Sequence, residues 1–161
     1  PPRQNSVAAV FIPLKKLSIK EVKNVIKEYD EVITKGLAIQ LVSNAVGDKI
    51  NEPYKNNSHW ASKALNNLIN KEIITDPSQW EDSLDQPVSI SLYMALICNI
   101  FGGISDIYKS RVPDHWGRNC LDTLCDKEII NSPEQWIDFE GQVRKDNALA
   151  LIYKTWIKYI K

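Results

Sequence analysis

The sequence predicts an all-α fold made of three helical repeats in a pseudo-threefold arrangement around a central three-helix bundle. Segments of the chain recur at a displacement of about 55 residues, and apolar residues recur at helical spacing inside each copy. One stretch in each copy is apolar almost all round, and a helix without a broad polar face must be surrounded by other elements. Three such helices most simply meet at a shared centre.

Two stretches of the chain carry the repetition most clearly. Each opens on a His-Trp pair, continues through a Leu-rich helical stripe and Lys-Glu-Ile-Ile, and ends on a tryptophan after a proline. The second copy keeps one register up to that tryptophan and slips by a single position beyond it. The matched positions include His59 and His115, Trp60 and Trp116, Ile73 and Ile129, Pro77 and Pro133, Trp80 and Trp136, and Val88 and Val143.

A third copy lies nearer the N-terminus and retains only its second half, which begins at Ile33. Its first half has no His-Trp pair and instead carries the spacing of a capping box from Ser18 to Glu21, which opens a helix. Terminal repeats are often atypical because only one side has a neighbour. We therefore expect a single domain of three repeats over about 1–50, 51–105 and 106–161.

Each repeat is expected to contain two helices joined by a short turn. Ser58 and Asp114 are good N-caps for the first helix, and the Ile-Ile pair closes it. Asp76 and Ser132 precede a proline that begins a short helical turn. A brief extended link leads to the apolar helix, which a glycine ends in the first two repeats. The apolar helices are expected over 37–46 with Thr34 as N-cap, 92–101 with Ser89 as N-cap, and 148–157.

Length and charge exclude several classes of protein. The 161 residues suit one compact body, and 20 basic against 20 acidic residues leave no net charge. A nucleic-acid partner is not expected, because phosphate contacts need an excess of basic residues. No apolar run is as long as the roughly 18 residues that a membrane-spanning helix needs, so membrane insertion is not expected. The chain begins Pro1-Pro2-Arg3 without a signal-peptide pattern, so we expect a processed product or a piece of something longer.

The order of these features resembles the S-layer homology (SLH) repeat. More narrowly, it is similar to the SLH-like repeats of wall-associated proteins and cell-wall hydrolases of Gram-positive bacteria and their phages. The resemblance covers 58–161 and, in part, 31–50. It implies three units around a pseudo-threefold axis, with grooves between them that hold secondary wall polysaccharide. It also implies an extracellular, cell-wall-associated location.

The ligand contacts of that family centre on a Thr-Arg-Ala-Glu type motif, whose arginine meets an acidic sugar substituent. A cation is kept in the first and third copies here, the second copy has none, and no copy keeps the glutamate. The corresponding segments are Thr34-Lys35-Gly36-Leu37, Ser89-Ile90-Ser91-Leu92 and Arg144-Lys145-Asp146-Asn147. The resemblance thus implies hydrogen-bonding and charged ligand contacts at Thr34, Lys35, Ser89, Arg144 and Lys145.

Four of the tryptophans divide into two pairs. Trp80 and Trp136 lie in the proline-containing turns, where a half-exposed ring can stack on the apolar face of a sugar, and we add them to the candidate ligand-binding residues. Packing inside the protein is the alternative for these rings, and it is favoured. Trp60 and Trp116 begin an apolar helical stripe and are expected in the core.

Cysteines and histidines do not predict catalysis or metal binding. Cys98, Cys120 and Cys125 stand where sister repeats carry serine, alanine and isoleucine, so they are interpreted as packing residues. The two histidines repeat beside a helix N-terminus, which favours a structural role, and they are too few for a metal site or a catalytic triad. We expect no enzyme, no cofactor and no metal.

Two functions from different classes remain open. The first is a non-catalytic module that binds cell-envelope glycans, either secondary wall polysaccharide or peptidoglycan, and anchors a larger protein. The second is a protein–protein scaffold or oligomerisation module, in which another protein or a second copy is the partner. The eroded ligand motif and the zero net charge make this second function credible.

Overall fold

The computed structural model describes residues 31–103 and 115–161, and these residues form helices without a β-sheet. The predicted all-α class is confirmed for this part of the chain. The capping box at 18–21 and the proposed cap Asp114 lie outside the described residues. The helices are α3 (Lys35–Val46), α4 (Ser62–Asn70), α5 (Ile90–Cys98), α6 (Arg118–Asp126) and α7 (Lys145–Thr155), with 3₁₀ turns at Tyr54–Asn56, Pro77–Gln79, Asn99–Phe101 and Pro133–Gln135 and a π-helical turn at Trp156–Ile160.

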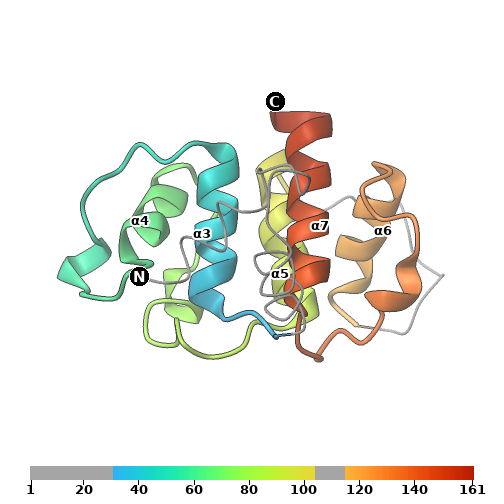
Figure 1. Ribbon diagram of the computed structural model, residues 1–161, viewed down its shortest axis with the longest axis horizontal. Helices are drawn as coiled ribbons and strands as arrows, with labels where there is room; N and C mark the ends of the chain where they lie inside the picture. Colours follow the sequence, from blue (N-terminus) through green and yellow to red (C-terminus); the bar gives the residue numbers. More distant parts are fainter. Residues whose placement is uncertain (1–30, 104–114) are drawn as a thin grey trace, which may run out of the picture.

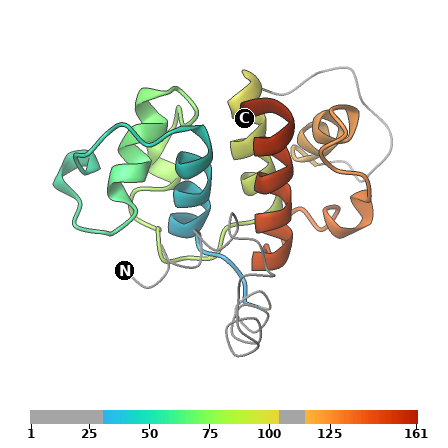
Figure 2. The same cartoon turned by 45° about the horizontal axis from the view of Figure 1, so that its top comes forward.

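The three apolar helices α3, α5 and α7 stand together at the centre, and α4 and α6 flank them on opposite sides (Figures 1 and 2). α3 contacts both α5 and α7. α5 is joined to α7 by the Tyr93 hydroxyl, which donates to the Ala148 carbonyl at 2.7 Å. Although these helices are apolar, no helix in 31–103 or 115–161 is long enough, and apolar enough, to cross a membrane.

Backbone hydrogen bonds tie the N-terminal ends of the three central helices to the chain before a neighbouring central helix. The first N–H groups of an α-helix have no partner inside the helix, and these bonds satisfy one at each end. The three donors occupy matching positions of the repeated sequence, and so do the three acceptors. The bonds run from Lys35 N to Gln86 O (2.8 Å), from Ile90 N to Gly141 O (2.9 Å) and from Lys145 N to Glu31 O (2.7 Å).

Side-chain caps begin the central helices α3 and α5 as predicted, but neither α7 nor the first flanking helix has one. The hydroxyls of Thr34 and Ser89 accept the N–H groups of the third residue beyond them, each at 3.1 Å. Ser58 does not cap α4, because that helix begins only at Ser62 and its N-cap residue Ala61 has no side-chain acceptor. In the turns, Asp76 accepts the Ser78 N–H at 3.2 Å. Its counterpart Ser132 makes no such bond.

The Ile-Ile pairs close both flanking helices, which confirms that prediction. The N–H groups of Ile73 and Ile74 both donate to Leu68 O, at 3.0 and 3.1 Å. The turn requires a left-handed residue just before the pair, and Glu72 has φ 59° there. The same arrangement recurs in the next repeat, with Ile129 and Ile130 on Leu124 and with Glu128 at φ 58°.

A close approach joins α3 to the start of α4, and another joins α5 to the start of α6. A Cβ added at Gly36 would lie 3.1 Å from the His59 ring and 3.4 Å from the Ala61 Cβ. At the equivalent contact, a Cβ added at Gly117 would lie 2.8 Å from the Ser91 Cβ. The glycine has therefore changed sides, since Ser91 corresponds to Gly36 and Gly117 to Ala61. At Gly36 the tightest neighbour of an added Cβ would be Leu84 O at 3.0 Å, so both sites favour glycine, but through different neighbours.

We expect Gly117→Ala to destabilise the protein by about 1–3 kcal/mol, because the added methyl group is too close to Ser91 and to the Phe139 ring at 2.9 Å. The double variant Ser91→Gly with Gly117→Ala removes the Ser91 Cβ from this contact and recovers that part of the loss, while the contact with Phe139 remains. Urea unfolding followed by circular dichroism measures both. Equal stability of the single and the double variant would contradict this account of the contact.

Tyr93 occupies the centre of the molecule between α5 and α7. Its counterparts at the same level are Ala38 and Ala148, so one large side chain and two small ones meet there, and all three are 0% exposed. Burial without a charged neighbour raises the pKa of Tyr93 above its ordinary value near 10. The phenol is thus neutral in the folded protein at any pH at which the fold is stable.

We expect the free energy of unfolding to fall as the pH rises above about 10, because the unfolded chain can ionise Tyr93 and the folded chain cannot. Below that pH the contribution of Tyr93 is fully present. Tyr93→Phe should cost about 1 kcal/mol at neutral pH through the lost hydrogen bond and should show a weaker alkaline loss. Unfolding curves of both proteins at pH 7 and above 10 make the comparison. Parallel alkaline losses would exclude Tyr93 as their source.

Candidate functional site

Two grooves of about 270 Å³ lie beside central helices, one at α5 and one at α7. The α5 groove is bounded by α5 and by the chain from the end of α4 to the Pro77–Gln79 turn, and the α7 groove by the equivalent elements. Every residue of the α7 groove has its counterpart at the matching repeat position in the α5 groove. Six pairs are identical: Ile73 and Ile129, Ile74 and Ile130, Gln79 and Gln135, Trp80 and Trp136, Ala95 and Ala150, and Leu96 and Leu151.

Both grooves combine an apolar lining with a few polar side chains. The apolar part comes from the Ile-Ile pair and the tryptophan, which belong to the buried core, and from residues of the central helix, of which Leu96 and Leu151 are buried. The shared polar groups are the amides of Gln79 and Gln135, and both residues are exposed. An apolar lining with a few hydrogen-bonding groups is typical of small-ligand sites and suits the two faces of a sugar ring.

The two grooves differ in charge at two of their matched positions. The α5 groove carries Asp76 and Asn99 where the α7 groove carries Ser132 and Lys154. The Ser78 side chain donates a hydrogen bond that lowers the pKa of Asp76, so this carboxylate is ionised at neutral pH. The α5 groove therefore contains a negative charge and the α7 groove a positive one, and they favour ligands of different charge.

Trp116 stands at the mouth of the α5 groove and is 55% exposed. This corrects the expectation that it begins an apolar helical stripe in the core. The reason is that α6 starts only at Arg118, so Trp116 lies in the turn before the helix and does not follow the helical face. Its ring makes a tilted contact with His115 at 5.4 Å between centroids. Trp116 is the exposed aromatic face that the grooves provide.

Trp80 and Trp136 line the grooves but do not stand as half-exposed platforms. They are 4% and 6% exposed and belong to the core. Packing inside the protein, which the sequence favoured, therefore holds for most of each ring, and the stacking role that made these residues candidate ligand contacts loses its half-exposed face. The physical reason is that the short 3₁₀ turn before each tryptophan folds back onto the central helix and carries the ring inward. They contribute to the apolar base of the grooves.

Thr34, Lys35 and Ser89 do not line either groove. Leu92, the last residue of the second motif segment, does line the α5 groove. The hydroxyls of Thr34 and Ser89 are used as helix caps. The Lys35 ammonium group donates to Gln79 O at 2.8 Å and to Ser83 Oγ at 2.9 Å. Lys35 thus holds the chain on both sides of Trp80 through hydrogen bonds to Gln79 and Ser83.

In the third repeat, Arg144 and Lys145 lie outside the two grooves, whereas Asn147, the last residue of that motif segment, lines the α7 groove. Arg144 is exposed and pairs with Asp146, with 2.7 Å between the guanidinium nitrogen and the carboxylate oxygen. Lys145 is only 2% exposed at the start of α7. A ligand-binding role for the motif residues Thr34, Lys35, Ser89, Arg144 and Lys145 stays a prediction, and it does not concern the α5 and α7 grooves.

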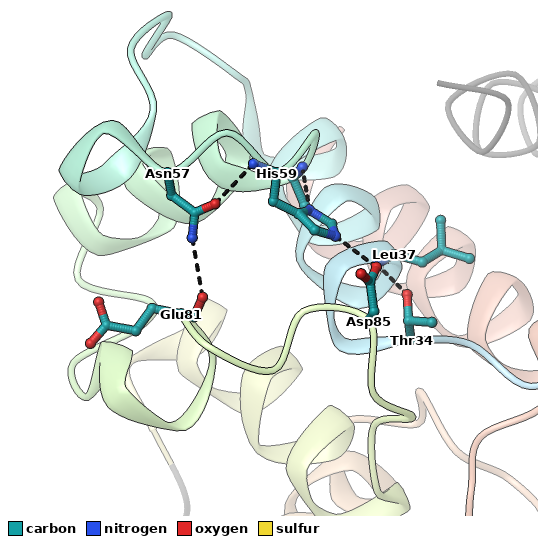
Figure 3. A network of polar contacts seen from close by, with 7 residues as sticks. Thr34, Leu37, Asn57, His59, Glu81 and Asp85 are labelled. Carbon is teal, nitrogen blue, oxygen red and sulfur yellow. Dashed lines mark hydrogen bonds and ion pairs between the residues drawn. The ribbon is translucent and has the colours of Figure 1, made fainter.

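His59 caps α4 through its ring, as Figure 3 shows. Its Nδ1 accepts the Ala61 N–H at 3.0 Å, so the proton is on Nε2, which meets Asp85 Oδ1 at 2.8 Å. Asn57 completes the network, because its side chain accepts the His59 N–H and donates to Glu81 O. The structural role predicted for the histidine is confirmed, because its ring accepts a backbone N–H at the start of α4.

The second histidine repeats this arrangement. The Gly117 N–H donates to His115 Nδ1 at 2.9 Å, and His115 Nε2 lies 2.6 Å from Glu140 Oε1. The ring also stacks on Phe139 at 4.8 Å between centroids. Each histidine therefore joins the start of a flanking helix to the loop before a central helix.

The chemistry available in the two grooves is that of binding. Their linings contain no histidine or cysteine, and Asp76 is the one carboxylate among the residues of both. Within 31–103 and 115–161, no three side chains of the metal-binding types converge. The chain matches no protein-family model and no curated protein. What the grooves offer is an apolar base, amide groups at the edge and, at α5, an exposed indole.

We expect His59→Ala to cost about 1 kcal/mol of stability, because the Ala61 N–H at the start of α4 loses its acceptor. His59→Asn should recover much of this, since the Asn Oδ1 atom can occupy the place of Nδ1. Asp85→Asn should change stability by less than about 0.5 kcal/mol, because its side chain is 81% exposed. Urea unfolding of the three variants tests the order. A larger loss for Asp85→Asn than for His59→Ala would assign the stabilisation to the carboxylate.

Proposed function

We propose that this chain is a non-catalytic, extracellular module that binds cell-envelope glycans of the Gram-positive wall and anchors a larger protein there. The observation that carries the proposal is the repetition of one groove, with the same lining residues, at α5 and α7. The buried residues that the two grooves share can be explained by the packing of the fold alone. The repetition of the exposed glutamines Gln79 and Gln135 at the groove edges favours a shared ligand class.

We further propose that the chain consists of three SLH-like repeats around a pseudo-threefold axis. Three backbone hydrogen bonds at matched repeat positions support this arrangement, because their donors and acceptors connect the three units in a closed ring. Three isolated β-bridges follow the same order. They pair Thr34 with Pro87, Ser89 with Gln142, and Val32 with Arg144.

The mechanism of binding follows from the groove chemistry. Sugar rings have apolar faces and polar edges, so a residue of the glycan can place one face on Trp116 and its hydroxyls near Gln79 and Asn99. The α7 groove has Lys154 in place of Asn99 and suits an acidic sugar or a phosphate substituent better than the α5 groove does. Each site is shallow and weak, and a polymeric wall glycan gains affinity by engaging more than one.

A protein–protein scaffold is the second candidate, and one observation favours it. The last turns of the chain expose apolar and aromatic side chains close to one another in sequence, with Tyr153, Ile157 and Tyr159 between 39% and 46% exposed. Exposed apolar patches mark interaction sites. A molar mass that rises with concentration in light scattering would favour this function over glycan binding.

The isolated chain should be retained on purified Gram-positive sacculi. Retention that disappears after extraction of the secondary polysaccharide identifies that polymer as the ligand, whereas unchanged retention identifies peptidoglycan. A co-sedimentation assay with quantified protein in pellet and supernatant measures both. Failure to sediment with either preparation would refute the proposal.

Variants of the grooves should weaken this retention without unfolding the protein. Trp116→Ala removes an exposed ring, and loss of about 1 kcal/mol of stacking reduces affinity about fivefold. Gln79→Ala combined with Gln135→Ala removes the shared amides and should have a comparable effect. Ile137→Ala is the matched control, because Ile137 is 40% exposed and lies outside both grooves. Retention of these variants equal to that of the wild-type protein would show that the grooves do not bind the glycan.

A further inference from the structure

Two side-chain amides of the α5 groove turn their acceptor ends away from the protein. Gln79 Nε2 donates to Asp76 Oδ2 at 3.3 Å, and Asn99 Nδ2 donates to Ile73 O at 3.0 Å. A carboxylate and a backbone carbonyl can only accept, so these contacts fix which end of each amide is the NH2 group. The carbonyl oxygens of both amides therefore point away from these partners.

Asp76 supplies the same groove with a negative charge that is held in one orientation. Its carboxylate accepts the Ser78 N–H, the Ser78 hydroxyl and the Gln79 amide. The hydrogen bond from the Ser78 hydroxyl lowers the pKa of Asp76, so the group stays ionised in weakly acidic solution. A carboxylate has about four acceptor sites, and Asp76 is exposed, so a ligand can still reach this carboxylate with a further donor.

Trp116 adds an exposed aromatic face at the mouth of the groove. Its side chain is 55% exposed. The face of an indole ring attracts a cation and also packs on the apolar face of a sugar. The described residues of the groove lining include no lysine or arginine. A carboxylate, amide oxygens and an indole face together suit an ammonium group, which has three hydrogens to donate.

The α7 groove has the same apolar base and the opposite charge. Lys154 lies where the α5 groove has Asn99, and Ser132 lies where it has Asp76. Among the described residues of its lining there is no counterpart of Trp116. A cationic ligand is therefore expected to prefer the α5 groove, although the two grooves share their shape.

We propose that the α5 groove binds a de-N-acetylated amino sugar, a glucosamine unit of a wall glycan, with its ammonium group on Asp76 and one sugar face on Trp116. This inference rests on the proposed function, because it names the class of sugar that one groove takes. The oxygens of Gln79 and Asn99 accept hydrogen bonds from the sugar hydroxyls. A groove of about 270 Å³ is small for a ligand site and suits a single sugar unit.

Nuclear magnetic resonance with two sugar tetramers tests this preference. The isotope-labelled chain is titrated at about pH 5.5, where the sugar amine is protonated, with a tetramer of glucosamine and with one of N-acetylglucosamine. The Trp116 indole N–H signal, assigned from its loss in Trp116→Phe, reports binding in the α5 groove. We expect the glucosamine tetramer to bind about fivefold more tightly, which is the upper end for an exposed ion pair. Equal affinities, or tighter binding of the acetylated tetramer, would overturn the inference.

Asp76→Asn removes the charge and keeps a side-chain oxygen for the Ser78 N–H, so the turn remains capped. The affinities of this variant for the two tetramers should become equal. Glu134→Gln is the matched control, because Glu134 is an exposed acidic residue of the equivalent turn and lies outside both grooves. It should keep the preference for glucosamine. A preference that survives Asp76→Asn would show that the carboxylate is not the group that binds the amine.

Co-sedimentation with sacculi separates this inference from the proposed function. A chain that sediments with sacculi but binds neither tetramer, or binds both equally, refutes the preference for an amine and leaves glycan binding standing. A chain that neither sediments nor binds a tetramer refutes both. Nα-acetyl-lysine amide is the third probe, since it carries an amine without a sugar. If it shifts the Trp116 signal with the affinity of the glucosamine tetramer, the groove recognises an amine and not an amino sugar, and the inference fails.

Discussion

The structure depends on one constraint, which is that the apolar faces of three central helices must be buried. α3 and α5 carry little polar surface, so they pack with α7 at the centre, and α4 covers α3 while α6 covers α5 (Figure 1). Backbone hydrogen bonds at the N-terminal end then fix the rotation of each central helix relative to its neighbour. The grooves follow from this arrangement, because each lies where a central helix meets the turn of its own repeat.

The repetition in the sequence was sufficient to predict the helical class and most helix boundaries. It placed Thr34 and Ser89 as caps and the Ile-Ile pairs as helix ends, since these depend on local hydrogen bonding that a short segment contains in full. It did not place the start of α4. There the backbone N–H is satisfied by the ring of His59 and not by Ser58, and a histidine acting as a cap has no distinctive pattern. The same shift left Trp116 outside the helix and exposed.

The site was less predictable than the fold. Motif positions pointed to residues at the N-terminal end of the central helices, where helix caps occupy the side chains of Thr34 and Ser89. The grooves are built from residues that are well separated in sequence, such as Gln79 and Asn99. Their proximity depends on how a turn packs on a helix, which periodicity does not specify. The sequence shows that Gln79 and Gln135 are the same residue at matched positions, but only the structure shows that both line a groove.

Comparison of matched positions in the repeats distinguishes residues that the packing of the helices requires from residues whose chemistry can vary. The close contact between central and flanking helices keeps one glycine although Gly36 and Gly117 lie on opposite partners, so the spacing itself is what the fold requires. The edges of the grooves are less restricted, because the α5 groove has the carboxylate of Asp76 at the position where the α7 groove has the hydroxyl of Ser132. A position that changes its chemistry while its neighbours retain theirs is not needed for packing. The two grooves therefore share a shape and differ in charge, which agrees with the proposed binding of a heterogeneous wall glycan.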